Sequence, residues 1–244
     1  MVNYLLDHLM KTANEKKEIE ENLLEYLSLS LLHLSLENCI YRDKIDDVQM
    51  EIKEKNFLEL AKNMLMKYSK NNFLIYNIVS ILRRIKDEEF EMLMTQELLY
   101  TYFALFDYFY LSTKQSYQDS NQKDVKFDLL ILKELVAILG NIVKEGIDIF
   151  NLEMHKKPFL DKNFHIVMLD IKLSFYFFPK LVKNTIGALI NLTTSDEIRE
   201  NLSKVAAFIQ SIYLILDKYQ SNQAIIDYEL KLIMNVLING NNEE

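Results

Sequence analysis

Residues 181–202 read LVKNTIGALINLTTSDEIRENL, which has the pattern of two helices joined by a tight turn. Apolar residues recur at three- and four-residue spacing up to residue 192, as expected of a helix that buries one face. Pro179 lies just before this run, and proline is tolerated in the first turn of a helix. The first helix is predicted to end at Thr193. Thr194 and Glu197 then match a capping box, which predicts that a second helix starts at once.

The composition extends this helical prediction to the whole chain. Half of the 244 residues are apolar, whereas glycine (4) and proline (2) are scarce. Sandwiches and barrels need many glycine- and proline-rich turns, so the chain is predicted to be all-α. Apolar periodicity predicts helices over residues 56–68, 73–85, 98–111, 127–144, 164–178, 202–219 and 223–238. Polar, aperiodic stretches predict a loop insert at residues 112–126, a turn at 155–158 and a tail at 241–244.

The charge and the single cysteine narrow the possible partners and compartments. The formal net charge is −8, and phosphate binding needs clustered Lys and Arg, so no nucleic-acid partner is expected. A basic or neutral protein surface suits such a chain better. No run reaches about 18 uncharged apolar residues, so no membrane span is expected. Cys39 has no second cysteine to pair with, which fits a reducing, cytoplasmic location.

The helix–turn–helix of residues 181–202 recurs along the chain. Each copy has an apolar helix that closes on an L-x-x-L-like pattern, then a polar turn, then a short helix. These patterns begin at Leu31, Leu82, Leu139, Leu189 and Met234, at intervals of about 51, 57, 50 and 45 residues. Units of this length that cannot bury their apolar faces alone are expected to stack and share a continuous core. The spacing therefore predicts an α-solenoid.

The segments ALINLTTSDEIRENL and LSLLHLSLENCIYRDKI resemble the junction between consecutive armadillo repeats, and HEAT repeats have a similar pattern. The resemblance implies a right-handed α-solenoid of armadillo-like three-helix repeats. It covers a single domain, residues 1–240. The implied parts are a half unit at 1–37 and units at about 38–86, 87–146, 147–194 and 195–240.

The same resemblance implies a binding face along the third helices. In armadillo proteins of the importin type, an asparagine there holds an extended peptide, and Asn191 and Asn141 match that position. The other units place His33 and Arg84 at the corresponding position. That family also has a tryptophan one turn earlier, whereas this chain has none. The resemblance thus implies a scaffold for a protein or peptide partner rather than a nuclear-localisation-signal receptor. The alternative for each asparagine is a structural role, on a helix surface or at a neighbouring helix end.

Two further groups of residues are candidates for partner binding. Arg83 and Arg84 interrupt an apolar helix and could meet an acidic partner; alternatively they pair with the acidic residues at 87–89. Seven aromatic residues between 100 and 110 could form a docking patch. The alternative is core packing, with only the outermost tyrosines facing outward.

No pattern of residues predicts catalysis. The four histidines, His8, His33, His155 and His165, lack the spacing of metal ligands, so no metal is expected. Phosphate-binding loops and nucleophile elbows need glycines that this chain does not have at the right spacing, so no cofactor or small-molecule substrate is expected. The sequence therefore predicts a non-catalytic interaction scaffold. Two alternatives stay open: a structural subunit fixed in a larger assembly, for example a cytoskeletal or ciliary one, and a helical enzyme whose site has no recognisable pattern.

Overall fold

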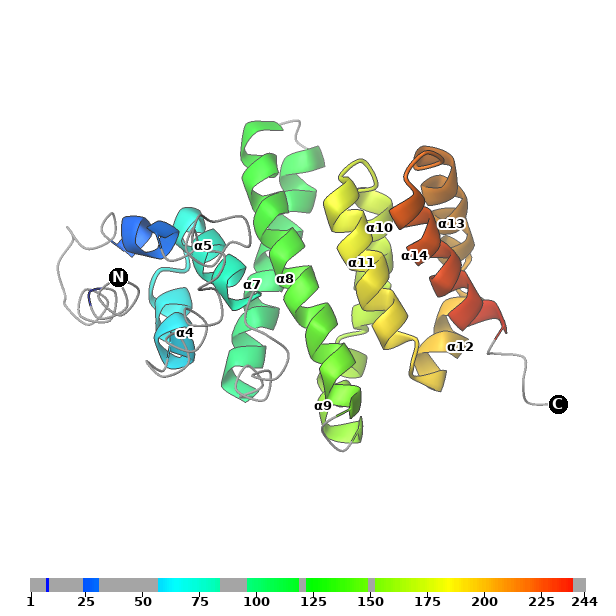
Figure 1. The fold of residues 1–244 in the computed structure, drawn as a ribbon, viewed down its shortest axis with the longest axis horizontal. Coiled ribbons are helices and arrows are strands. Elements are labelled where there is room, and N and C mark those ends of the chain that lie inside the picture. Colours follow the sequence, from blue (N-terminus) through cyan, green and yellow to red (C-terminus); the bar gives the residue numbers. More distant parts are fainter. Residues whose placement is uncertain are drawn as a thin grey trace, which may run out of the picture. The chain divides into compact units, whose positions relative to one another are not determined.

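The computed structural model describes residues 8, 24–30, 57–83, 96–118, 122–148 and 152–238. All regular secondary structure in these ranges is helical, so the all-α prediction is confirmed there (Figure 1). The helices are α4 (Phe57–Lys67), α5 (Asn72–Leu82), α7 (Gln96–Gln118), α8 (Gln122–Asp148), α9 (Leu152–Asp161), α10 (Phe164–Ser174), α11 (Pro179–Leu192), α12 (Asp196–Lys204), α13 (Ala206–Lys218) and α14 (Gln223–Ile233). The chain then continues as a π-helical turn, η3 (Met234–Ile238).

The chain divides into two compact units. Unit 1 comprises Met1–Ser112 and Ser120–Leu135, and unit 2 comprises Thr113–Asp119 and Val136–Glu244. Helices α7 and α8 each contribute residues to both units.

Local sequence explains where the helices of unit 1 begin and end. Asn71 caps α5, because its side-chain oxygen accepts a hydrogen bond from the Leu74 amide at 2.9 Å. In α4, Glu59 lies in the first turn and Lys67 in the last, as the helix dipole favours. Almost every side chain of α5 is buried, whereas α4 exposes one side, so α5 lies at the centre of this unit.

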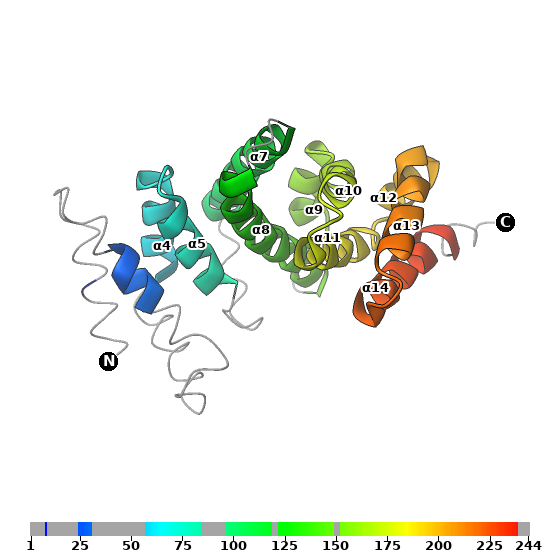
Figure 2. The same ribbon diagram turned by 90° about the horizontal axis from the view of Figure 1, so that it is seen from above.

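In unit 2, helices α10 and α11 form one packed pair, and α13 and α14 form a second. The two pairs stack, so that α10 lies beside α13 and α11 beside α14 (Figure 2). Pro179 occupies the start of α11, as predicted. Asn222 caps α14 by accepting a hydrogen bond from the Ile225 amide. The core of this unit includes the fully buried side chains of Phe164, Phe175 and Phe208.

Side-chain hydrogen bonds between helices show a recurrent separation. In unit 1, Asn72 bonds to Asp128 and Arg83 to Glu134, across 56 and 51 residues. In unit 2, Lys114 bonds to Asp170 and Lys172 to Glu229, across 56 and 57 residues. Asn191 reaches the Gly140 carbonyl across 51 residues.

The predicted loop at residues 112–126 is wrong where the structure describes it, because α7 extends to Gln118 and α8 begins at Gln122. The polar residues there have tertiary partners that periodicity does not reveal. Ser112 donates a hydrogen bond to Asp128 at 2.9 Å, and Lys114 pairs with Asp170 at 2.8 Å. The ring of Tyr117 stacks on Phe177 with centroids 5.1 Å apart. These contacts stabilise two extra turns of helix.

Three other local predictions are corrected. Residues 155–158 are helical, within α9, and Pro158 lies inside that helix. The predicted helix over residues 202–219 is two helices, because Val205 adopts an extended conformation between α12 and α13. Ser195, not Thr194, is the N-cap residue of α12; the Thr194 hydroxyl instead donates a hydrogen bond to the Asn191 carbonyl at 2.8 Å.

Candidate functional site

Asn191, the leading candidate from the sequence, makes a contact within the protein. Its side-chain nitrogen donates a hydrogen bond to the backbone carbonyl of Gly140, at 2.9 Å. Helices α8 and α11 approach closely at this point, since a Cβ on Gly140 would lie 3.0 Å from the Ala188 Cβ. The side chain thus ties α11 to α8. This is the structural role that the sequence left open, at a carbonyl within the neighbouring helix rather than at its end.

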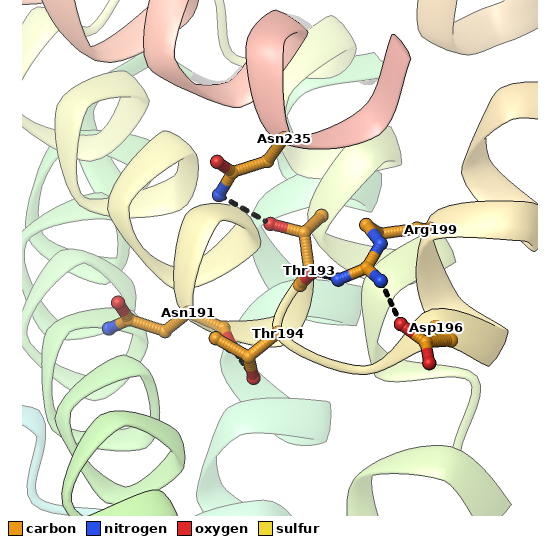
Figure 3. A network of polar contacts seen from close by, with 6 residues as sticks. All are labelled: Asn191, Thr193, Thr194, Asp196, Arg199 and Asn235. Carbon is orange, nitrogen blue, oxygen red and sulfur yellow. Dashed lines mark hydrogen bonds and ion pairs between the residues drawn. The ribbon is translucent and has the colours of Figure 1, made fainter. Parts of the chain in front are cut away.

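The turn after Asn191 is held by a polar network (Figure 3). Asn235 of η3 donates a hydrogen bond to the Thr193 hydroxyl at 3.1 Å. Arg199 of α12 donates to the Thr193 carbonyl at 3.0 Å and pairs with Asp196. The network joins three elements, α11, α12 and η3, and so holds the turn at residues 193–195 in place.

The other candidates from the sequence are only partly described. Asn141 is partly exposed on α8, directly after Gly140, so it lies near Asn191 in unit 2. Arg83 pairs with Glu134 of α8 at 2.6 Å, an acid far away in sequence. The acidic residues at 87–89 lie outside the described residues. Arg84 and His33 lie outside the described residues.

The aromatic run in α7 is divided between core and surface. Tyr102, Phe103, Phe106 and Phe109 are buried, whereas Tyr100 and Tyr108 are 54% and 55% exposed. The two exposed tyrosines follow the four-residue spacing of one helix face, with the exposed Ala104 between them. The aromatic run therefore supplies core residues on one side and a tyrosine-flanked surface on the other.

That surface forms one wall of a groove in unit 1, with a volume of about 860 Å³. Helix α4 and the turn after it supply the other wall. The residues that line the groove are Lys62, Asn63, Leu65, Met66, Ser69, Lys70, Tyr100, Thr101, Ala104, Leu105 and Tyr108. The sequence alone does not predict the α4 side, because isolated exposed residues of a short helix have no distinctive pattern. The four-residue spacing of Tyr100, Ala104 and Tyr108 was the one sequence pattern that could have indicated the α7 side of the groove.

Unit 2 buries an ion pair between α10 and α14. The Lys172 ammonium lies 2.5 Å from a Glu229 carboxylate oxygen, and both side chains are fully buried. Burial lowers the pKa of Lys172 and raises that of Glu229, while each charge opposes the shift of the other. The second oxygen of Glu229 has no hydrogen-bond partner among the residues that the structure describes. The lysine also lies 5.9 Å from the centroid of the Phe208 ring, so the pair connects three helices.

His165 is a second buried titratable group in this unit. Burial lowers its pKa below the usual value of 6.5, while the negative charge of Glu197 acts in the opposite direction. Within the described part of the chain, its Nδ1 atom has no hydrogen-bond partner. The neutral imidazole is therefore the form that this site favours.

Within the described residues, no group of three or more His, Cys, Asp or Glu side chains is placed to hold a metal ion. In the same part of the chain, no helix combines the length and hydrophobicity needed to cross a bilayer. Comparisons with family models, with curated proteins and with solved structures find no match.

Proposed function

We propose that this chain is a non-catalytic, cytoplasmic scaffold that binds a partner protein or peptide, built as a right-handed α-solenoid of armadillo-like units. The observation that carries the proposal is the separation of 51 to 57 residues between hydrogen-bonded residues of different helices. Examples are Arg83 with Glu134, Asn191 with the Gly140 carbonyl, and Lys172 with Glu229. In a solenoid each unit contacts its neighbours in sequence, so such contacts recur at the repeat length.

The packing of the helix pairs also supports a repeated unit. In unit 2, α10 lies beside α13 and α11 beside α14, so each helix contacts the one that follows it by about one repeat. In unit 1, α5 is joined in the same way to α8, through Phe73 and Phe127, whose ring centroids are 5.9 Å apart. In unit 2, the end of α8 contacts α11 and α11 contacts α14, so these three helices share one side.

The proposed binding face is that side of α8, α11 and α14. It carries the partly exposed Asn141 and Asn191. Tyr228 of α14 contacts the face of α11 at Gly187, where an added Cβ would lie 3.5 Å from the tyrosine ring. The ammonium of Lys183 lies 5.2 Å from the centroid of the same ring. An exposed tyrosine beside polar side chains is typical of a protein-binding surface.

The test has two stages. Chemical crosslinking of the full chain in its native source, read by mass spectrometry, identifies the partner. Affinity is then measured with the purified partner for Tyr228→Ala, with Tyr213→Ala on α13 as a matched exposed control. A loss of tenfold or more, about 1.4 kcal/mol, is expected for Tyr228→Ala alone. Equal affinity of the two variants would remove this face from the proposal, and a specific catalysed reaction of the isolated chain would overturn the non-catalytic role.

A permanent structural subunit is the second candidate function, and one observation favours it. Besides Tyr228, helices α13 and α14, with η3, expose five large apolar side chains: Ile209, Tyr213, Leu230, Met234 and Leu237. Exposed apolar patches of this kind mark surfaces that are covered in an assembly. This candidate predicts the reverse result, in which Tyr213→Ala weakens association and Tyr228→Ala does not.

A further inference from the structure

The groove in unit 1 has two parallel ridges and an apolar floor. On the α4 side, Lys62, Met66 and Lys70 follow at four-residue spacing. On the α7 side, Tyr100, Ala104 and Tyr108 do the same. The buried side chains of Leu65 and Leu105 form the floor.

The middle of the groove is open because its central residue is small. Ala104 lies between two tyrosines that are each more than half exposed, and Met66, opposite, is 63% exposed. A single large apolar side chain entering above Ala104 would contact both tyrosines and the methionine. Methionine adapts to the shape of a bound apolar group, and tyrosine is a frequent anchor of interfaces.

The charge of the groove differs in sign from the charge of the chain. The net charge of the chain is −8, but the described residues that line the groove include two lysines, Lys62 and Lys70, and no carboxylate. Lys62 forms an ion pair with Glu59 at 2.8 Å, whereas Lys70 is exposed in the turn after α4. The exposed Lys67, at the end of α4, is a third cation in this segment. A ligand with apolar residues in the centre and acidic residues at the flanks complements this arrangement.

We propose that this groove docks an acidic amphipathic helix of a partner protein; the proposal rests on the scaffold function and identifies the chemistry of one ligand. An amphipathic helix places apolar anchors at three- and four-residue spacing into a groove between helices. Leucine-like anchors enter between Tyr100 and Tyr108, and glutamates or aspartates flank them toward Lys62 and Lys70.

A protein helix fits the groove better than single-stranded nucleic acid does. Stacked aromatic side chains with nearby cations can also hold unpaired bases. Backbone phosphates, however, need a track of cations, and the groove offers two lysines in a strongly acidic chain.

The experiment measures binding of labelled peptides to the full chain by fluorescence anisotropy. The first peptide is a helical 16-mer with leucines at three- and four-residue spacing and flanking glutamates; the second has lysines in place of every glutamate. We expect the acidic peptide to bind at least about tenfold more tightly, and its affinity to fall as salt rises. Because long-range attraction to an acidic chain favours the lysine peptide, this preference must come from the groove itself.

A matched pair of variants locates the site. Ala104→Glu fills the centre of the groove with a negative charge, whereas Ala224→Glu makes the same change at an exposed position of α14. Ala104→Glu is expected to weaken binding of the acidic peptide by about tenfold or more, and Ala224→Glu to leave it unchanged. Lys70→Gln is expected to weaken it by a smaller factor and to reduce its salt dependence.

Several results would overturn the proposal: equal binding of the two peptides, insensitivity to Ala104→Glu, or tighter binding of a single-stranded thymidine oligonucleotide. Self-association of the chain that Ala104→Glu abolishes would show that a second copy occupies the groove instead. The scaffold function can hold even if the groove binds no acidic peptide. In that case, Tyr228→Ala still weakens binding of the crosslinked partner. The scaffold function fails separately if the chain has no partner at either surface.

Discussion

The groove between α4 and α7 in unit 1 and the crossing of α8 and α11 in unit 2 are both built around small residues. At the crossing, Gly140 faces Ala188, and the two helices lie so close that Asn191 reaches the Gly140 carbonyl. In the groove, Ala104 is small as well, but it is exposed between two exposed tyrosines. A small residue thus allows close packing in one place and leaves a cleft in the other.

The difference shows what decides whether a helix face is structural or available for binding. At the crossing and around it, polar side chains form hydrogen bonds within the protein. Asn191 donates to the Gly140 carbonyl, Asn235 to the Thr193 hydroxyl and Lys172 to Glu229. In the groove, Lys70, Tyr100 and Tyr108 are exposed around an apolar floor. Substitutions are therefore expected to affect stability in the first region and binding in the second.

The largest effect is expected from Lys172→Met, which leaves Glu229 buried without its cation. Breaking a buried ion pair from one side typically destabilises a protein by about 3–5 kcal/mol. The double variant Lys172→Met/Glu229→Leu removes both charges and should recover most of that loss. Urea denaturation of the three proteins measures this, and equal stability of the single and double variants would contradict the isolated-charge argument.

A smaller effect is expected from Gly140→Leu, because the added side chain meets Ala188 at the crossing. Overpacking of this kind destabilises by about 1–3 kcal/mol. Gly187→Ala is the matched control, since its Cβ would lie at an ordinary contact distance of 3.5 Å from the Tyr228 ring. Alanine favours a helix over glycine by up to about 1 kcal/mol, so this variant should be more stable. Thermal unfolding of both variants compares them, and destabilisation by Gly187→Ala would be unexpected.

Asn191→Ala should destabilise the chain by about 1 kcal/mol, the usual contribution of one hydrogen bond. Asn141→Ala, at a partly exposed position one residue from Gly140, should change stability by less than about 0.5 kcal/mol. Urea midpoints of the two variants give the comparison. If they were equally stable, the Asn191 bond to α8 would not contribute.

His165 should make the stability of unit 2 depend on pH. Burial lowers the pKa of the folded imidazole below 6.5, so the unfolded chain takes up the proton first as the pH falls. The free energy of unfolding should therefore decrease from about pH 6.5 down to the folded pKa and then level off. Urea midpoints at pH 7.5 and pH 5.0 measure the change. His165→Gln should remove this component, and an unaltered pH profile in that variant would assign the dependence to other groups.

The smallest effect on stability is expected in the groove. Tyr108→Ser removes a ring that is more than half exposed and should change stability by less than about 0.5 kcal/mol. Its neighbour Phe109 is fully buried, and Phe109→Ala should cost about 3–5 kcal/mol. Similar losses for the two variants would mean that the groove is part of the core in solution.

Particular elements show how far the sequence predicted the fold and the site. The start of α11 at Pro179, the turn before α5 and the helical class follow from local patterns, and the structure confirms them in the described residues. The helix over residues 112–118 was missed because Lys114 and Tyr117 are held by Asp170 and Phe177, far away in sequence. The α4 side of the groove was missed for the same reason, because Met66 lines a groove only when α4 lies beside α7.

By itself, the sequence determined the helical class and several helix ends of the described residues, because periodicity and capping depend on residues within one or two turns. Only the tertiary structure decided the burial and the contacts of Asn191, Lys172 and Ala104. Their surroundings come from helices tens of residues away in sequence, and one such neighbour can bury a polar group, pair a charge or leave a small residue open. The stretch at residues 181–202 thus specifies two helices and a turn, whereas its contact with Gly140 makes Asn191 a structural residue.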